Sequence, residues 1–181
     1  MNEKERTRVS RFLSLVLRHK PGEIGLQLDA QGWADVAELI ERAAAKGKIF
    51  TAQDLEEIVA TNDKQRFAYS EERTKIRASQ GHSVEVELQL EETTPPDQLY
   101  HGTVEKYLRA IQAQGLRKMN RHHVHMSSDT ITAEKVGERR GEAVILTINS
   151  GDMSRDGFVF YLSANGVWLT DQVPVKYIIF K

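Results

Sequence analysis

The chain has 181 residues, of which 40% are hydrophobic and 28% charged, a composition typical of a globular protein with one medium domain or two small ones. It contains no cysteine, which excludes disulfides and thiolate metal sites. No stretch approaches the roughly 18 apolar residues of a membrane span, and no apolar signal core follows the charged N-terminus, so we expect a cytoplasmic protein without a membrane partner.

The formal net charge of −1 hides an uneven distribution. Residues 1–83 carry 14 Lys and Arg against 13 Asp and Glu, residues 84–98 carry none against 5, and residues 99–181 carry 11 against 8. Both long blocks are therefore slightly basic. This balance permits a nucleic-acid partner without requiring one, because dedicated nucleic-acid-binding domains are usually far more basic.

The first predicted element is a helix that ends before Pro21. Its apolar residues recur at helical spacing, as in the pairs Phe12 with Val16 and Leu13 with Leu17. Proline disfavours helical geometry at the preceding residue, so the cationic run 18–20 lies in or beyond the last turn. Cations there complement the helix dipole, but an anchored helix could equally present Arg-His to a bound anion.

The rest of the first block predicts a short strand, two more helices and a hairpin. The strand is expected around 26–28, the helices over 34–46 and from a Thr51 capping box onward, and the hairpin over 66–69 and 75–78. Three helices followed by a hairpin is the order of a winged-helix module. Such modules often bind nucleic acids, although helix-turn-helix units also serve as protein-interaction domains.

Residues 84–90 alternate apolar and polar side chains like a half-buried strand, and Pro95-Pro96 after a polar run indicates a domain boundary. The second block has more predicted strands than helices, which favours a largely antiparallel α+β lobe. Its helices are expected over 104–114 and 132–139, and its strands over 123–126, 143–148, 158–162, 167–169 and 177–180.

The sequence lacks the common motifs for zinc, phosphate loops and nucleophilic hydrolysis. It contains no H-E-x-x-H, no Walker A or dinucleotide glycine motif, and no G-x-S-x-G. A strand at 123–126 would place His123 and His125 on one face, but solvated or hydrogen-bonded histidines are more common than such a metal site. We therefore expect no metal.

Two segments could contact a ligand. The segment 100–103 passes from strand to helix; Thr103 could cap that helix, and Gly102 would let a ligand approach the backbone. An ordinary capped turn explains the same residues equally well. The hydroxyls of 127–128 could bond a ribose or cap the next helix, and Trp168 is expected in the core.

Taken together, the chain resembles the RNA 2′-phosphotransferase family, also called tRNA 2′-phosphotransferases. Eight motifs in the right order carry this resemblance over nearly the whole chain. They are LSLVLRHKP (13–21), LDAQGWADV (28–36), ATNDKQRFAYS (60–70), IRASQGHS (76–83), LYHGT (99–103), HVHMSSD (123–129), AEKVGERRG (133–141) and NGVWLT (165–170).

The resemblance implies an α+β protein with a winged-helix RNA-binding lobe over 1–92, a linker at 93–98 and an ADP-ribosyltransferase-like NAD-binding lobe over 99–181. It also implies the reaction: an internal RNA 2′-phosphate attacks NAD and expels nicotinamide, giving 2′-phospho-ADP-ribosylated RNA. The ribose O2″ then attacks the phosphorus, releasing a 2′-OH and ADP-ribose 1″,2″-cyclic phosphate. The expected partners are NAD and a tRNA-like RNA from splicing or repair, with the protein a monomer.

The family's catalytic tetrad maps onto four residues of this chain, Arg18, His19, Arg66 and Arg139. Family members often show GxRHG at the last of these positions, where this chain has Arg140; the spacing favours Arg139. The arginines would hold the phosphate, and His19 would bond it or move a proton. The residues expected to bind NAD are His101, Gly102, Thr103, His125, Ser127 and Ser128.

Two alternatives remain from the sequence alone. The first is an ADP-ribosyltransferase that stops after the first step and modifies nucleic-acid phosphates. The second is a non-enzymatic winged-helix protein that binds nucleic acid.

Overall fold

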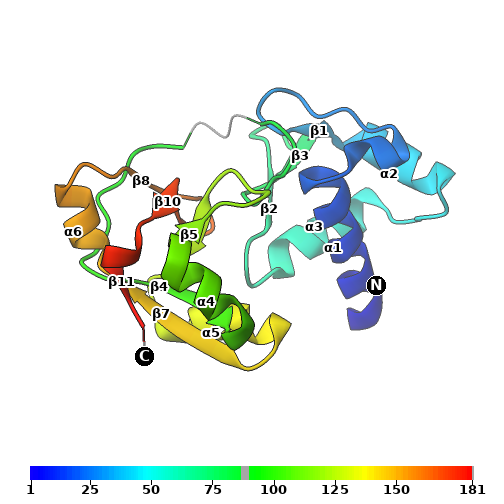
Figure 1. Cartoon of the computed structure of the whole chain (residues 1–181). Helices are drawn as coiled ribbons and strands as arrows, with labels where there is room; N and C mark the ends of the chain where they lie inside the picture. The colour runs from blue at the N-terminus through cyan, green and yellow to red at the C-terminus, as the bar shows by residue number, and fades with distance from the viewer. Residues whose placement is uncertain (87–89, 181) are drawn as a thin grey trace. The chain divides into compact units, whose positions relative to one another are not determined.

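The computed structural model describes residues 1–86 and 90–180, and the chain divides into two compact units, Met1–Gln89 and Leu90–Lys181 (Figure 1). Residues 93–98, predicted as a linker, lie in the second unit, where the Ser150 hydroxyl donates to the carbonyl of Pro96. The assignment of a separate function to each unit stays a prediction. None of the described helices combines the length and apolarity needed to cross a membrane.

The first helix of unit 1, α1 (Glu3–Arg18), ends where the sequence predicts. A capping box closes its N-terminus: the Asn2 side chain accepts from the Glu5 amide, and the Glu5 carboxylate accepts from the Asn2 amide. Its apolar stripe is buried at Val9, Leu13, Val16 and Leu17. The 3-10 helix η1 (Pro21–Ile24) follows, because Pro21 stops the α-helix and suits the first position of a new turn.

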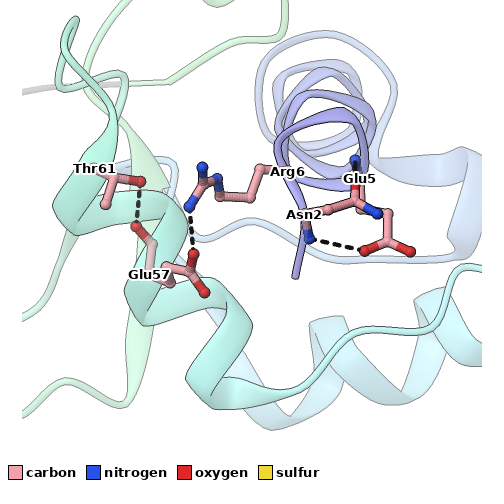
Figure 2. Close-up of polar contacts among 5 residues, drawn as sticks. All are labelled: Asn2, Glu5, Arg6, Glu57 and Thr61. Carbon is pink, nitrogen blue, oxygen red and sulfur yellow. Dashed lines mark hydrogen bonds and ion pairs between the residues drawn. The ribbon is translucent and has the colours of Figure 1, made fainter.

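Two further helices, α2 (Val36–Ala45) and α3 (Ala52–Thr61), complete the helical part of unit 1. The predicted Thr51 capping box is confirmed, since Thr51 and Asp54 exchange side-chain and backbone bonds. An ion pair between Arg6 and Glu57, 2.5 Å from nitrogen to oxygen, ties α1 to α3 (Figure 2). The buried stripe of α1 shares one core with buried residues of α2 and α3.

A small antiparallel sheet covers this core, with the order β1-β3-β2. The strands are β1 (Ala34–Asp35), β2 (Phe67–Tyr69) and β3 (Lys75–Ala78), so the predicted hairpin is confirmed. The predicted strand around 26–28 is wrong. There the chain bends at Asp29, whose carboxylate accepts from the amides of Gln31 and Trp33, and Leu26 is buried without pairing to a strand.

The predicted strand over 84–90 is not found where the structure describes it. Residues 84–86 and Leu90 lie outside any strand, and 87–89 fall outside the described residues. Val84 and Val86, which contribute to the alternating sequence pattern, are half-buried in a segment without regular secondary structure.

Unit 2 contains two three-stranded antiparallel sheets and a two-stranded one, as the α+β expectation requires. The first has the order β11-β7-β4, and the second β6-β9-β8. Backbone bonds exchanged between Tyr100 and Ser127 link β4 to the residue after β6. The strands are β4 (Leu99–Val104), β5 (Leu116–Arg117), β6 (Val124–Met126), β7 (Ala143–Ile148), β8 (Phe160–Leu162), β9 (Trp168–Thr170), β10 (Gln172–Val173) and β11 (Ile178–Ile179).

Helix α5 (Thr130–Gly137) packs on β4 and β7 and leads directly into the 3-10 helix η2 (Glu138–Arg140). Asp129 caps α5 by accepting from the Thr132 amide. The expectation that Thr103 caps a helix is wrong, because β4 runs through it to Val104 and its side chain is buried. The remaining helical elements of the unit are α4 (Glu105–Gln114), α6 (Ser150–Arg155) and η3 (Val175–Tyr177).

Candidate functional site

In unit 1 the residues Arg18 and His19 lie at the C-terminal end of α1, held by one short segment. The Arg18 carbonyl accepts from the Ser83 amide at 2.9 Å and from the Val84 amide at 3.2 Å. The hydroxyl of Ser83 lies 2.9 Å from Nδ1 of His19. Ser83 therefore contacts both residues, one through its backbone and the other through its side chain.

Arg66 is bound to the same segment at its other end. Its carbonyl accepts from the Ser79 amide at 2.8 Å, and the Ser79 hydroxyl donates to the carbonyl of Gln65. Gln65 adopts a left-handed conformation, with φ of 42°, which turns the chain into β2. Residues 79–83 thus connect the backbone of Arg66 to that of Arg18, so the structure brings the three predicted residues of this unit to the two ends of one five-residue segment.

In unit 2 two predicted histidines from neighbouring strands are joined by a hydrogen bond. Nδ1 of His101 on β4 lies 2.8 Å from the carbonyl oxygen of His125 on β6. A carbonyl only accepts, so this Nδ1 must carry a proton. Burial lowers the pKa of His101, and the positive charges of Arg140 and Arg121 lower it further, although the bond to the His125 carbonyl opposes them. His101 is therefore neutral near pH 7, with Nε2 as an acceptor.

The ring of His125 receives a hydrogen bond from an arginine that the sequence reasoning did not select. Nη1 of Arg121 lies 3.0 Å from Nδ1 of His125. A guanidinium has donors and no acceptor, so Nδ1 must accept and the proton of the neutral ring is on Nε2. The two histidines consequently differ at Nε2, where His101 accepts and His125 donates.

Three arginine charges act within this group: Arg121 bonds the His125 ring, Arg140 and Arg121 act on His101, and Arg139 acts on Arg121. Arg121 is exposed as a residue, but partial desolvation of its guanidinium lowers its pKa, and the charges of Arg140 and then Arg139 lower it further. Within residues 1–86 and 90–180, none of the three forms an ion pair with a carboxylate. Like charges held close together without a neutralising acid favour the binding of an anion.

Arg139 and Arg140 both belong to η2 and both have exposed side chains. The Arg140 charge acts on His101 and Arg121, and its guanidinium lies 5.8 Å from the centre of the Tyr107 ring. The Arg139 charge acts on Arg121. The assignment of Arg139 to the catalytic tetrad stays a prediction, and Arg140 is a neighbour of the predicted NAD-binding residues that the sequence reasoning left out.

The remaining predicted ligand residues have different surroundings. A Cβ on Gly102 would meet the carbonyl oxygen of Ala133 at 1.8 Å, so this glycine allows α5 to pack on β4. Thr103 is buried opposite Val144, and Ser127 is half-buried beside His125. The hydroxyls of 127–128 do not cap α5, because Asp129 does. Direct contact of these residues with a ligand stays a prediction.

Sequence reasoning missed Arg121 and Ser83, and considered Arg140 only as the alternative to Arg139, for one shared reason. Arg121 bonds the His125 ring on the following strand, the Arg140 charge acts on His101 on another strand, and Ser83 bonds His19 at a helix end 64 residues away. Each of these contacts becomes apparent only in the folded chain. The only sequence signal was that Arg121 precedes a histidine-rich strand. Among the described residues, no three metal-binding side chains gather as a metal site would require.

Comparison with known proteins gives a consistent result. A model of the family described as "RNA 2′-phosphotransferase, Tpt1 / KptA family" matches residues 4–172. A protein of Flavobacterium johnsoniae is 61% identical over 181 residues, covering 100% of both chains. A protein of Burkholderia pseudomallei is 56% identical over 174 residues, covering 96% of this chain and 95% of the relative.

A third relative, from Streptomyces coelicolor, is 54% identical over 180 residues and covers 99% of this chain and 98% of its own. All three carry the name "Probable RNA 2′-phosphotransferase". The matches span both units and include every residue placed above. The chain belongs to the RNA 2′-phosphotransferase family.

Proposed function

We propose that this protein is an NAD-dependent enzyme that removes an internal 2′-phosphate from RNA. The phosphate oxygen would bond to C1″ of the NAD ribose as the C1″–N bond breaks, and nicotinamide would leave with the electron pair. O2″ would then bond to the phosphorus as the bond from phosphorus to the RNA 2′-oxygen breaks; O2″ loses its proton and the RNA 2′-oxygen gains one. The RNA would recover its 2′-OH, and ADP-ribose 1″,2″-cyclic phosphate would be released. Membership of the family supports this reaction.

The architecture of each unit suits one of the two substrates. Unit 1 has three helices and a three-stranded antiparallel sheet that ends in a hairpin, which supports a winged-helix lobe for RNA. In unit 2, His101 lies on β4 of one three-stranded antiparallel sheet and is bonded to His125 on β6 of the other, which supports an ADP-ribosyltransferase-like lobe for NAD. We propose these two lobes as the RNA-binding and NAD-binding parts.

The observation that carries the proposal is the cluster of His101, His125 and three arginines in unit 2. A dinucleotide presents a pyrophosphate dianion beside ribose hydroxyls that both donate and accept. The cluster offers an acceptor on His101, a donor on His125, and positive charge from Arg121 and η2. Thr103, Ser127 and Ser128, with the backbone at Gly102, would complete the NAD site.

The tetrad Arg18, His19, Arg66 and Arg139 would act on the RNA 2′-phosphate. The nucleophile of the first step is already an anion, so it needs positioning more than a strong base. In the second step negative charge grows on the phosphoryl oxygens, and preorganised guanidinium groups stabilise this charge best. His19, whose Nδ1 is bonded to Ser83, would use its other nitrogen to bond the phosphate or move the proton between the ribose oxygens.

NAD binding can be tested apart from the chemistry. Titration of NAD should raise the melting temperature of the wild type, because a ligand that binds only the folded state stabilises it. His101→Ala should remove most of this increase. Arg155→Ala, which removes an exposed charge at the end of α6, should leave it unchanged. A wild type that does not respond to NAD would contradict the proposal.

A further inference from the structure

The hydrogen bond from Arg121 to His125 is an unusual use of an arginine. Its partner is a neutral ring nitrogen, whereas a carboxylate would pair the guanidinium with an opposite charge and give a stronger bond. The donor also lies near two other cations, Arg139 and Arg140, whose charges disfavour its own. An uncharged donor could hold the ring without repulsion from Arg139 and Arg140. Local stability therefore does not explain why an arginine occupies this position.

The bond determines which nitrogen of His125 carries the proton. A neutral histidine in water exchanges its proton between the two nitrogens, and either one can face a ligand as donor or acceptor. Occupation of Nδ1 by the Arg121 donor leaves the proton on Nε2.

The backbone of His125 is fixed independently of its ring. The His125 carbonyl accepts a hydrogen bond from the His101 ring, and His125 is paired with Leu169 in the antiparallel ladder of β6 and β9. Arg121 itself lies in a turn, in which its amide donates to the carbonyl of Lys118. The strand therefore positions Cα of His125, and the arginine determines the orientation of the ring and its tautomer.

We infer that Arg121 is a positioning residue that holds His125 in its Nε2–H form, so that the ring donates to an oxygen of the bound dinucleotide. The oxygen is of the hydroxyl or phosphoryl class, because both accept from an N–H. The functional part of this inference rests on the proposed NAD-dependent reaction. The tautomer is a property of the protein without ligand.

The tautomer is tested by nitrogen–proton NMR correlation of the histidine side chains in the ligand-free protein near pH 7. The wild type should show His125 with a protonated Nε2 and an unprotonated Nδ1. Arg121→Met, which keeps an apolar stem but removes the donor, should give a mixture of both tautomers. Arg155→Met, a matched loss of an exposed charge, should leave the spectrum of His125 unchanged. A protonated Nδ1 in the wild type would overturn the inference.

The functional consequence is tested by kinetics and a double-mutant cycle. Arg121→Met should lower kcat/KM for NAD by about ten- to a hundredfold, the range for loss of one charge-assisted hydrogen bond. Arg121→Lys, which keeps a donor, should recover part of the loss. In a His125→Ala background, Arg121→Met should cost little more, because both residues act through one ring. Fully additive losses would mean that Arg121 binds the substrate directly, which would overturn the positioning role.

The two hypotheses can fail separately. Suppose that the wild type shows the Nε2–H tautomer, that Arg121→Met loses it, and that NAD and RNA do not react. This result would refute the proposed function but leave the role of Arg121 in setting the tautomer intact. An active wild type with the opposite tautomer would refute the inference alone.

Discussion

Replacement of Gly102 by alanine tests how the site of unit 2 is held together. Gly102 lies in the middle of β4, next to His101, and α5 crosses the strand at this point. An added Cβ would lie 1.8 Å from the carbonyl oxygen of Ala133, 2.7 Å from its carbonyl carbon and 2.9 Å from the amide nitrogen of Gly137. All three atoms are backbone, so no side-chain rotation can relieve the contact.

The size of the effect follows from how far α5 must move. To lengthen the shortest contact from 1.8 Å to the 3.0 Å below which real Cβ contacts essentially never occur, the helix must shift by at least 1.2 Å. Overpacking of a core costs about 1–3 kcal/mol when side chains can adjust. Because the backbone must move here, we expect a loss of at least about 3 kcal/mol, or roughly 12 °C in the melting temperature of a unit of this size.

Helix α5 leads into η2, which carries Arg139 and Arg140, so Gly102→Ala should also lower activity at temperatures where the protein remains folded. Calorimetry and far-ultraviolet circular dichroism would measure unfolding. Gly22→Ala is the matched control, because a Cβ there meets no atom within 4 Å and the residue does not have a positive φ. An unfolding transition of Gly102→Ala equal to that of the wild type would refute the packing of α5 on β4.

Three further predictions concern stability. Asp129→Ala should cost about 1 kcal/mol through loss of the α5 cap, measured by urea unfolding, and Asp129→Asn should retain most of it. Arg6→Met should lower the free energy of unfolding by about 0.2–1 kcal/mol, because it removes the ion pair with Glu57. The difference from the wild type should become smaller in 1 M salt, and a loss that does not depend on salt would contradict this cause. Burial lowers the pKa of both His101 and His123 below the ordinary value of about 6.5, so the unfolded chain binds more protons and unit 2 should lose stability as the pH falls from 7 toward 5. Replacing both histidines by glutamine should flatten that dependence in a thermal unfolding series.

Elements with a strong local signal could be predicted from the sequence. The end of α1 before Pro21 and the capping box at Thr51 depend on neighbours within four residues, and both are confirmed. The strand around 26–28 was wrong because two leucines two residues apart also suit an irregular segment, and the Asp29 turn decides the conformation. The pairs β5–β10 and β1–β3 could not be predicted, because β1, β5 and β10 have only two residues each and carry no periodicity.

The same division applies to the candidate site. The motifs identified the family, and His101 and His125 of unit 2 as residues of interest. They could not show that Gly102 faces a helix, which depends on the packing of α5 on β4. Nor could they show that Arg121 bonds the ring of His125 four residues later, which depends on the path of the turn before β6. Local reasoning expected Thr103 to cap a helix, but the ladder between β4 and β7 extends to Val104 and takes precedence over that cap.

The central claim is tested most directly by one incubation of the purified protein with NAD and a short RNA carrying a single internal 2′-phosphate, with magnesium chelated. The RNA and the small-molecule products are followed together. The proposed function predicts loss of the phosphate from the RNA, with release of nicotinamide and ADP-ribose 1″,2″-cyclic phosphate. An ADP-ribosylated RNA that accumulates without resolving would contradict the two-step reaction in favour of a one-step transferase. RNA and NAD that both remain unchanged in the presence of folded protein would contradict the enzymatic proposal itself.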